Sequence, residues 1–258
     1  MEKKKIFIWI ALVAIIAVLV FQILINGKNK DKDVAIDKDF SHVEVESENS
    51  DIEFMNIDGK EALIELENDD KNRYKLDVKV KGNTLEIDVE RKGFSWFSFD
   101  FFSKSPKVTI GLPNKDYGTI KAETDNGTID VSKIKVNELE ADTDNGEMII
   151  KEIESQRIDV ESDNGDVVIE NSIGVIQGKT NNGNVTVTMD TIEQPMDLET
   201  DNGQIHLQTK DKAKNVQFNV KTDNGRVNIY GQTTTEKAIG DGNIKIQLTS
   251  DNGNITVE

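Results

Sequence analysis

Six aspartates recur at nearly constant spacing, and they are the residues of this chain whose pattern most suggests shared chemistry. They are Asp125, Asp144, Asp163, Asp201, Asp223 and Asp251, with Asn181 at the equivalent position of one further copy. Stacked about 4.8 Å apart, their carboxylates would repel one another, and Ca²⁺ bound through oxygen ligands would relieve that repulsion. However, the calcium-binding pattern G-G-x-G-x-D is absent, and Asp is favoured before turns, where it points into water. We therefore expect no metal site, and a calcium-binding surface protein remains an alternative.

The chain offers little for catalysis. It has two histidines and no cysteine. His206 lies between Ile205 and Leu207, hence on the outward face of an expected strand, and His42 precedes the strand residue Val43. Neither has a plausible Ser or Cys nucleophile nearby in sequence, and there is no Gly-rich phosphate loop or metal-spaced His/Cys cluster. These observations predict a protein that is not an enzyme and needs no cofactor.

The aspartates belong to a longer repeat, φ-x-φ-x-[TS]-[DN]-N-G-x-φ-x-φ, where φ is apolar. It occurs seven times, for example from Ile120 to Val131, and the gaps between its glycines are 19, 19, 18, 20, 22 and 28 residues. A period near twenty residues is typical of a stacked repeat architecture. The turn residues are Asn126, Gly127, Asn145, Gly146, Asn164, Gly165, Asn182, Gly183, Asn202, Gly203, Asn224, Gly225, Asn252 and Gly253.

Two architectures fit this repeat, because Asn-Gly is also the strongest hairpin signal. In a meander the strands would pair across each turn, whereas in a solenoid they would pair between successive coils. The fixed spacing favours the solenoid, where Asn stacks on Asn and the buried Thr or Ser hydrogen-bonds along the stack. We expect an all-β, single-stranded β-helix or solenoid with coils of about twenty residues over 116–258. In this architecture Gly would supply a positive φ at the corner.

The repeat is less regular toward both ends of the domain. Val43 to Phe54 form a degenerate copy with Ser50 in place of Gly, followed by about four periods of decayed pattern before Asn126. The segment 34–115 therefore reads as an N-terminal degenerate region, with an antiparallel hairpin around Gly82. Residues Gly231 to Gly240 look like a loop inserted into one coil, and the last coil should end the stack without a cap.

The N-terminus predicts a membrane anchor. Ile6 to Ile25 are apolar except for Gln22, long enough at about 1.5 Å per residue to cross a bilayer, and too long for a typical signal peptide. The lysines of 1–5 favour a cytoplasmic tail. Residues 26–33 read as a polar linker, so the domain should lie outside the cell on a single-pass anchor.

Charge excludes one class of partner. Without the six Lys and three acidic residues of 1–33, the chain holds 25 basic and 45 acidic residues, a net charge of about −20. This opposes nucleic-acid binding, which needs the opposite sign.

An aromatic segment at 94–102 interrupts the N-terminal region. It contains Phe94, Trp96, Phe97, Phe99, Phe101 and Phe102. Left in water, it would form an apolar patch large enough to mark an interface with a partner or membrane. As an alternative, it covers the N-terminal end of the solenoid.

Several of these motifs together resemble a known family. The anchor, the Val43 to Phe54 start, the V-T-I-x-L-P strand at Val108 to Pro113 and the T-D-N-G repeats are similar to the "putative adhesin" β-strand-repeat family. In particular they look like its LiaG-like membrane-anchored members from Gram-positive bacteria, over about residues 36–258. This resemblance implies a β-solenoid on the cell surface and no catalytic residues. We therefore expect a non-enzymatic, adhesin-like scaffold or binding module that contacts cell-wall polymer or a membrane protein. The alternative is an accessory component of a cell-envelope stress-sensing system.

Overall fold

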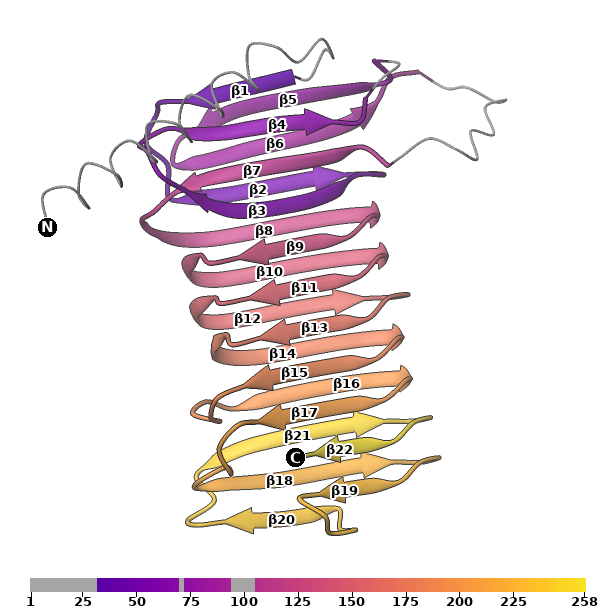
Figure 1. The fold of residues 1–258 in the computed structure, drawn as a ribbon. Helices are drawn as coiled ribbons and strands as arrows, with labels where there is room; N and C mark the ends of the chain where they lie inside the picture. Colours follow the sequence, from indigo (N-terminus) through magenta and orange to yellow (C-terminus); the bar gives the residue numbers. More distant parts are fainter. Residues whose placement is uncertain (1–31, 70–71, 94–104) are drawn as a thin grey trace, which may run out of the picture.

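The computed structural model describes residues 32–69, 72–93 and 105–258, and in these residues every regular element is a β-strand. The strands form two sheets of eleven strands each, stacked into one elongated body (Figure 1). In spatial order, sheet A contains β1 (Lys32–Ile36), β4 (Ala62–Glu67), β7 (Lys107–Pro113), β3 (Asp51–Ile57), β9 (Ile129–Ser132), β11 (Met148–Lys151), β13 (Val167–Glu170), β15 (Val185–Met189), β17 (Ile205–Thr209), β22 (Ile255–Val257) and β19 (Val227–Ile229). Sheet B contains β20 (Glu236–Ile239), β18 (Val216–Thr222), β21 (Ile244–Ser250), β16 (Met196–Asn202), β14 (Ile173–Asn182), β12 (Glu154–Ser162), β10 (Lys135–Asn145), β8 (Asp116–Asn126), β2 (His42–Ser47), β6 (Thr84–Arg91) and β5 (Tyr74–Lys81).

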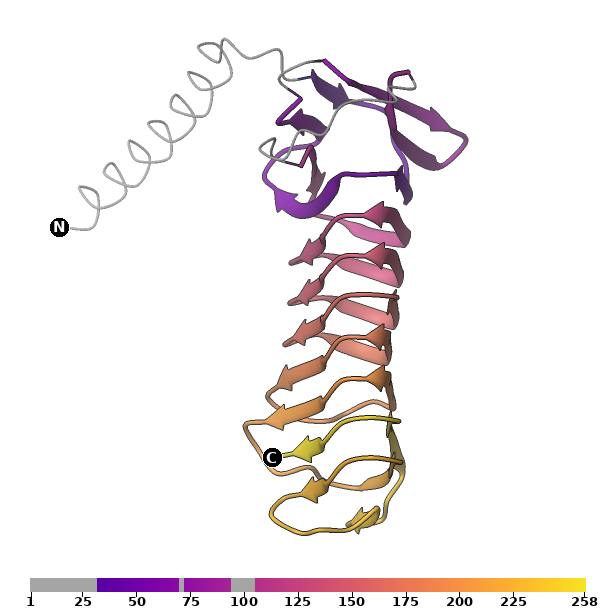
Figure 2. The ribbon, with the colours of Figure 1, turned by 90° about the vertical axis from the view of Figure 1, so that its right-hand side faces the viewer.

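Each repeat forms one coil of a solenoid. A strand of sheet B runs into a turn at the T-D-N-G motif, and the chain returns along sheet A, as Figure 2 shows in side view. Equivalent residues pair between coils in parallel: Met148 lies opposite Ile129 on one side and Val167 on the other. The solenoid prediction is therefore confirmed, and the hairpin meander is wrong for the repeats.

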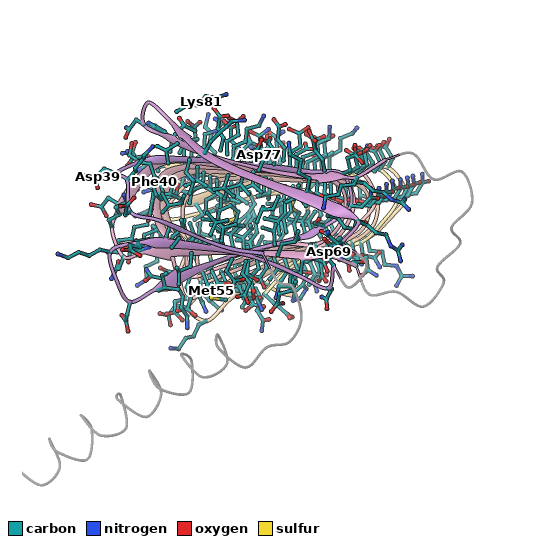
Figure 3. The ribbon with its side chains drawn as sticks, turned by 90° about the horizontal axis from the view of Figure 1, so that it is seen from above. Asp39, Phe40, Met55, Asp69, Asp77 and Lys81 are labelled. Atoms are coloured by element: carbon teal, nitrogen blue, oxygen red, sulfur yellow. The ribbon has the colours of Figure 1, made fainter. Side chains whose placement is uncertain are left out.

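Period-two alternation in the sequence decides which residues form the core. On β11, Met148 and Ile150 are buried, whereas Ile149 between them is partly exposed. The same alternation in the paired strands brings Ile, Val and Leu side chains from both sheets into one continuous core. Viewed along the stack, side chains fill the space between the sheets, and oxygen and nitrogen atoms stand on the outside (Figure 3).

The coils do not stack in the order of the sequence. The last coil, β21 and β22, lies between the coil of β16 and β17 and the coil of β18 and β19. Consequently, the expectation that the last coil ends the stack uncovered is wrong. The segment read as an inserted loop, Gly231 to Gly240, lies in the stretch that carries the chain back, and part of it forms β20 antiparallel to β18. The long gap between the last two motifs thus reflects a reversal in stacking order.

The N-terminal region also differs from the expected decayed coils. The degenerate copy, β2 and β3, stacks directly on β8 and β9, with no decayed coils between them. The following residues form only one further parallel coil, β6 and β7, whose strands pair with β2 and β3. β1, β4 and β5 are antiparallel to their neighbours, and β5 with β6 forms the hairpin expected at Gly82. Antiparallel strands therefore flank the parallel stack at both ends of sheet B and at the N-terminal end of sheet A.

Candidate functional site

The T-D-N-G corner is held together by side chains that bind the next coil. Thr143 Oγ1 donates a hydrogen bond to the carbonyl oxygen of Gly127 at 3.3 Å, and Ser162 Oγ repeats this bond to Gly146 at 3.0 Å. Asn145 Nδ2 donates to Asn126 Oδ1 at 3.0 Å. The hydroxyl groups therefore bind the glycine carbonyls of the adjacent coil rather than one another, while the asparagine amides form a continuous ladder. These bonds fix the corner and leave the motif with a structural role.

Glycine is required at the motif positions because the backbones of adjacent coils approach each other closely there. The prediction that these glycines adopt a positive φ is wrong. None of the motif glycines is among the residues with positive φ. Instead, a Cβ atom at Gly146 would lie less than 3.0 Å from the carbonyl oxygen of Gly127, and every motif glycine meets the backbone of its neighbouring coil in this way. Positive φ occurs at the opposite corner, between sheet A and the next strand of sheet B, at residues such as Lys133 and Glu152. The sequence carried no obvious signal for those residues, because neither type favours the left-handed region.

The six candidate aspartates of the corner do not converge. Asp125, Asp144 and Asp163 are exposed beside the turn, and Asn181 Nδ2 donates to Asp163 Oδ1 at 2.7 Å. Among the described residues, no group of three or more His, Asp or Glu side chains could hold a metal ion. The position before a turn thus places these carboxylates in water.

The outer surface of sheet B carries columns of acidic residues. They were missed from the sequence, because they become neighbours only when the strands are paired. In one column, Glu46, Glu123, Asp142 and Glu161 lie on consecutive paired strands. The adjacent column contains Glu44, Lys121, Glu140, Asp159, Gln177 and Asp197. Carboxylates stand in the same register on β2, β8, β10, β12 and β16, whereas β14 contributes Gln177 and Lys179, and we call the surface formed by these columns the acidic face.

Crowding on the acidic face perturbs the carboxyl of Asp142. Burial raises the pKa of Asp142, and the nearby charges of Glu161 and Glu123 raise it further. Salt bridges neutralise only part of the face, for example Lys179 to Glu161 at 3.1 Å. The negative charge of the face is therefore incompletely compensated by the protein itself.

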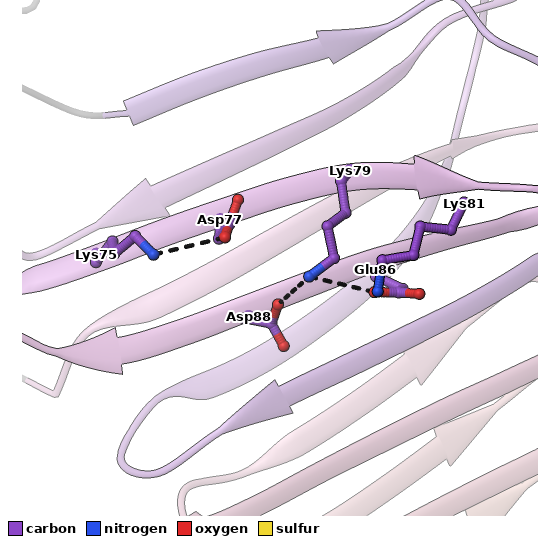
Figure 4. Close-up of polar contacts among 6 residues, drawn as sticks. All are labelled: Lys75, Asp77, Lys79, Lys81, Glu86 and Asp88. Carbon is purple, nitrogen blue, oxygen red and sulfur yellow. Dashed lines mark hydrogen bonds and ion pairs between the residues drawn. The ribbon is translucent and has the colours of Figure 1, made fainter.

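A basic strand borders the acidic face at its N-terminal end. Lys79 on β5 pairs with Asp88 at 3.2 Å and with Glu86 at 3.3 Å, and Lys81 pairs with Glu86 at 2.8 Å (Figure 4). The hydrogen bonds that Lys79 donates to Asp88 and Glu86 raise the pKa of Lys79, and the bond that Lys81 donates to Glu86 lowers the pKa of Glu86. Lysine on an edge strand opposes pairing with a further strand, so β5 ends sheet B.

The outer face of sheet A carries far less charge. One of its columns contains Ile149, Val168, Thr186, His206 and Thr256 on consecutive paired strands. His206 points outward as predicted, and its Nε2 lies 3.3 Å from Glu258 Oε1. His42 lies on β2 in sheet B, so the two histidines stand on different sheets. The fold does not bring them together.

Two predicted features lie outside the described residues. These are the anchor Ile6 to Ile25 and the aromatic residues Phe94 to Phe102. Within the described part of the chain, no helix is long and apolar enough to cross a membrane. Because β6 ends at Arg91 and β7 begins at Lys107, the aromatic residues are inserted in the chain where the other coils have their T-D-N-G corner.

The fold and corner geometry define a class, the two-sheet parallel β-solenoid with an asparagine ladder. The family described as Toastrack DUF4097 matches residues 40–174 and, in a second overlapping alignment, 120–258. The chain therefore belongs to this family. No curated protein matches the chain.

Several solved structures are similar over most of the chain. A "putative adhesin" from Parabacteroides distasonis is 15% identical, with a TM-score of 0.48, over 89% of this chain and 98% of that chain. A "putative adhesin" from Bacteroides fragilis is 14% identical, with a TM-score of 0.45, over 89% and 97%. A "putative cell adhesion protein" from Clostridium sporogenes is 15% identical, with a TM-score of 0.36, over 88% and 99%.

Proposed function

We propose that this protein is a non-enzymatic, adhesin-like binding scaffold, anchored by Ile6 to Ile25 and displayed outside the cell like the LiaG-like proteins it resembles. The acidic face carries this proposal. Its carboxylates lie in fixed register on five of the six paired strands from β2 to β16, and β14 contributes Gln177 and Lys179 instead. A surface of this kind suits an extended ligand with cationic groups, because most of its coils present carboxylates at equivalent positions.

The absence of a convergent site among the described residues supports a binding role over catalysis. An enzyme brings an acid, base or nucleophile together in a cavity. Here the two histidines stand on different sheets, and the crowded carboxyl of Asp142 lies on the outer surface of the acidic face. Carboxylates arranged in open columns provide electrostatic attraction, which favours association with a cationic partner.

The orientation of the domain follows from the anchor. Three lysines precede the apolar segment, which favours an N-terminus in the cytoplasm. The solenoid would then project from the outer side of the membrane. Its cross-coil hydrogen bonds make it a rigid spacer as well as a binding surface.

Retention on isolated cell envelopes tests the binding role. The full-length chain, purified in detergent micelles, is compared with a variant that loses three charges on the acidic face: Glu123→Gln, Asp142→Asn and Glu161→Gln. A matched control loses three charges on or beside sheet A: Asp130→Asn, Glu147→Gln and Glu170→Gln. We expect the wild type and the control to be retained, and the acidic-face variant to be released.

Salt provides a second readout. An ionic contact should weaken as the screening length falls to about 10 Å at 0.1 M ionic strength. Equal retention of all three proteins, independent of salt, would contradict a role for the acidic face. Retention that depends on one membrane protein and is lost with purified wall would favour the stress-sensing alternative.

A further inference from the structure

The corner opposite the T-D-N-G motif is built in the same way before β10 and before β12. At each of these corners, two residues connect sheet A to the next strand of sheet B: Lys133 and Ile134, then Glu152 and Ile153. The first has positive φ and the second is a buried isoleucine. A charged residue then begins the next strand. In a repeat protein the features that neighbouring coils share are those that the fold requires.

The corner before β14 and the start of β14 itself differ from these two corners at three positions. Ser172 replaces the buried isoleucine, and its Oγ accepts a hydrogen bond from Ile153 N at 3.2 Å. Ile173 pairs with Glu154 and is 56% exposed, and Val175 pairs with Arg157 and is 39% exposed. Two exposed apolar side chains therefore stand where the preceding coil has charged ones. The fold does not require them, because the coils on the N-terminal side do without them.

The following corner is longer and leaves a hollow beside Ser172 and Ile173. Residues 190–195 connect β15 to β16, in place of the two residues used by the preceding coils. The hollow measures about 290 Å³, at the small end of ligand pockets, which hold roughly 300–1,000 Å³. Its apolar lining includes Ile173, Ile176, Met189 and Met196.

The polar lining of the hollow is acidic. It includes the carboxylates of Asp190 and Glu193 and no lysine or arginine. Glu193 accepts a hydrogen bond from Thr191 at 3.2 Å, and among the described residues the carboxylate of Asp190 has one distant, exposed partner, Lys210 at 3.8 Å. A surface ion pair of that kind contributes little. Both carboxylates therefore remain available to a ligand cation.

We propose that this hollow binds one large apolar side chain of a peptide or protein partner, with a Lys or Arg next to it in the partner's sequence. The four apolar residues would bury the side chain, and Asp190 and Glu193 would bind the neighbouring cation. An acyl chain is a poorer fit, because a fatty-acid carboxylate or a lipid phosphate would meet these carboxylates. The proposal specifies a partner class within the proposed binding role, but it requires neither the membrane anchor nor the acidic face.

A peptide titration tests the proposal. Fluorescently labelled peptides with a central Lys-Phe-Lys, Lys-Ser-Lys or Glu-Phe-Glu in a Gly-Ser context are titrated against the full-length chain in nanodiscs, and anisotropy gives the Kd. We expect the Lys-Phe-Lys peptide to bind most tightly. Asp190→Asn with Glu193→Gln should weaken it by roughly threefold to tenfold, as expected for two exposed ionic contacts, and should not weaken binding of the Glu-Phe-Glu peptide, which has no cation.

The neighbouring coils supply the decisive variants. Ser172→Ile restores the residue type of Ile134 and Ile153 and should fill part of the hollow, so binding should be lost. Ile173→Gln should weaken binding by roughly fivefold to tenfold through lost apolar burial. The matched control is Leu63→Gln, which changes a 47% exposed residue on the distant strand β4 and should leave binding unchanged. Thermal denaturation of each variant checks that it is folded.

Three results would overturn the proposal. The first is wild-type binding by a folded Ser172→Ile protein. The second is equal affinity for the three peptides. The third is displacement of the Lys-Phe-Lys peptide by octanoate as effectively as by unlabelled peptide, which would identify an acyl ligand. None of these results would change envelope retention through the acidic face, so the two proposals fail separately.

Discussion

Replacing a motif glycine by alanine should separate two coils of the solenoid. In Gly146→Ala the new Cβ would lie less than 3.0 Å from the carbonyl oxygen of Gly127, a distance that real Cβ atoms do not adopt. The clash is with backbone, so the coils themselves must move apart. Gly146 lies in the interior of the stack, which leaves little freedom for that movement.

The cost follows from the bonds at this corner. The clash threatens the bond from Gly127 N to Asn145 O at 3.2 Å, the Thr143 hydroxyl bond at 3.3 Å and the Asn145 to Asn126 amide bond at 3.0 Å. At about 0.5–1.5 kcal/mol each, their loss should destabilise the protein by about 2–4 kcal/mol. For a domain of this size, this corresponds to a fall in Tm of roughly 5–15 °C.

Urea denaturation followed by circular dichroism measures this loss, and asparagine substitutions identify its cause. Gly82 has a φ of +60° with nothing within 4 Å of a Cβ, so Gly82→Ala should cost about 1–2 kcal/mol and Gly82→Asn less, since Asn tolerates that conformation. At position 146, Asn should be at least as harmful as Ala. If Gly146→Asn were well tolerated while Gly146→Ala was not, the close-approach explanation would be refuted.

Further predictions concern which residues of a strand face the core, the stacking order of the coils and the charge of Asp142. Ile150→Asp should cost more than about 3 kcal/mol, because it buries an unpaired carboxylate, whereas Ile149→Asp should cost less than about 1 kcal/mol; equal urea midpoints would contradict the inward and outward assignment. Deleting residues 244–258 should abolish cooperative unfolding of the C-terminal coils, because it removes an interior coil; unchanged cooperativity would restore the sequential order. Asp142→Asn should raise the Tm at pH 7, since the native fold raises the pKa of Asp142 above its ordinary value of 3.8 and so disfavours its charged form. As the pH falls through the raised pKa toward 3.8 the wild type gains this stability, so the difference in Tm should disappear; a pH-independent difference would contradict the charge explanation.

The regular repeats could be predicted from sequence because each position has one dominant constraint. Alternation assigned Ile149 and Ile150 to opposite faces, and the constant gaps indicated which residues pair. The explanation for Gly146 was wrong because two different constraints produce the same preference for glycine: a close backbone contact between coils and a left-handed turn. Both reasons demand glycine, and only the distance to Gly127 separates them.

The order of the last coils could not be predicted, for an energetic reason. The coils that contain Gly225 and Gly253 both turn apolar residues inward at equivalent positions, for example Val220 and Leu248, so either can stack on the coil of Gly203. A gap of 28 residues is compatible with a local loop or with a return past one coil. The corner hollow was missed for another reason: Ser172 and Ile173 are ordinary residues in sequence and become unusual only when aligned with the adjacent coils.

The claim that this solenoid is displayed outside the cell is tested most directly by cysteine labelling, because the chain has no cysteine of its own. Glu147→Cys places a thiol at an exposed position beside the Gly146 corner, and Lys4→Cys places one in the expected cytoplasmic tail. A membrane-impermeant maleimide added to intact cells should label the Glu147→Cys protein and should label the Lys4→Cys protein only after permeabilisation. Labelling of Glu147→Cys only after permeabilisation would contradict external display and with it the proposed adhesin-like role.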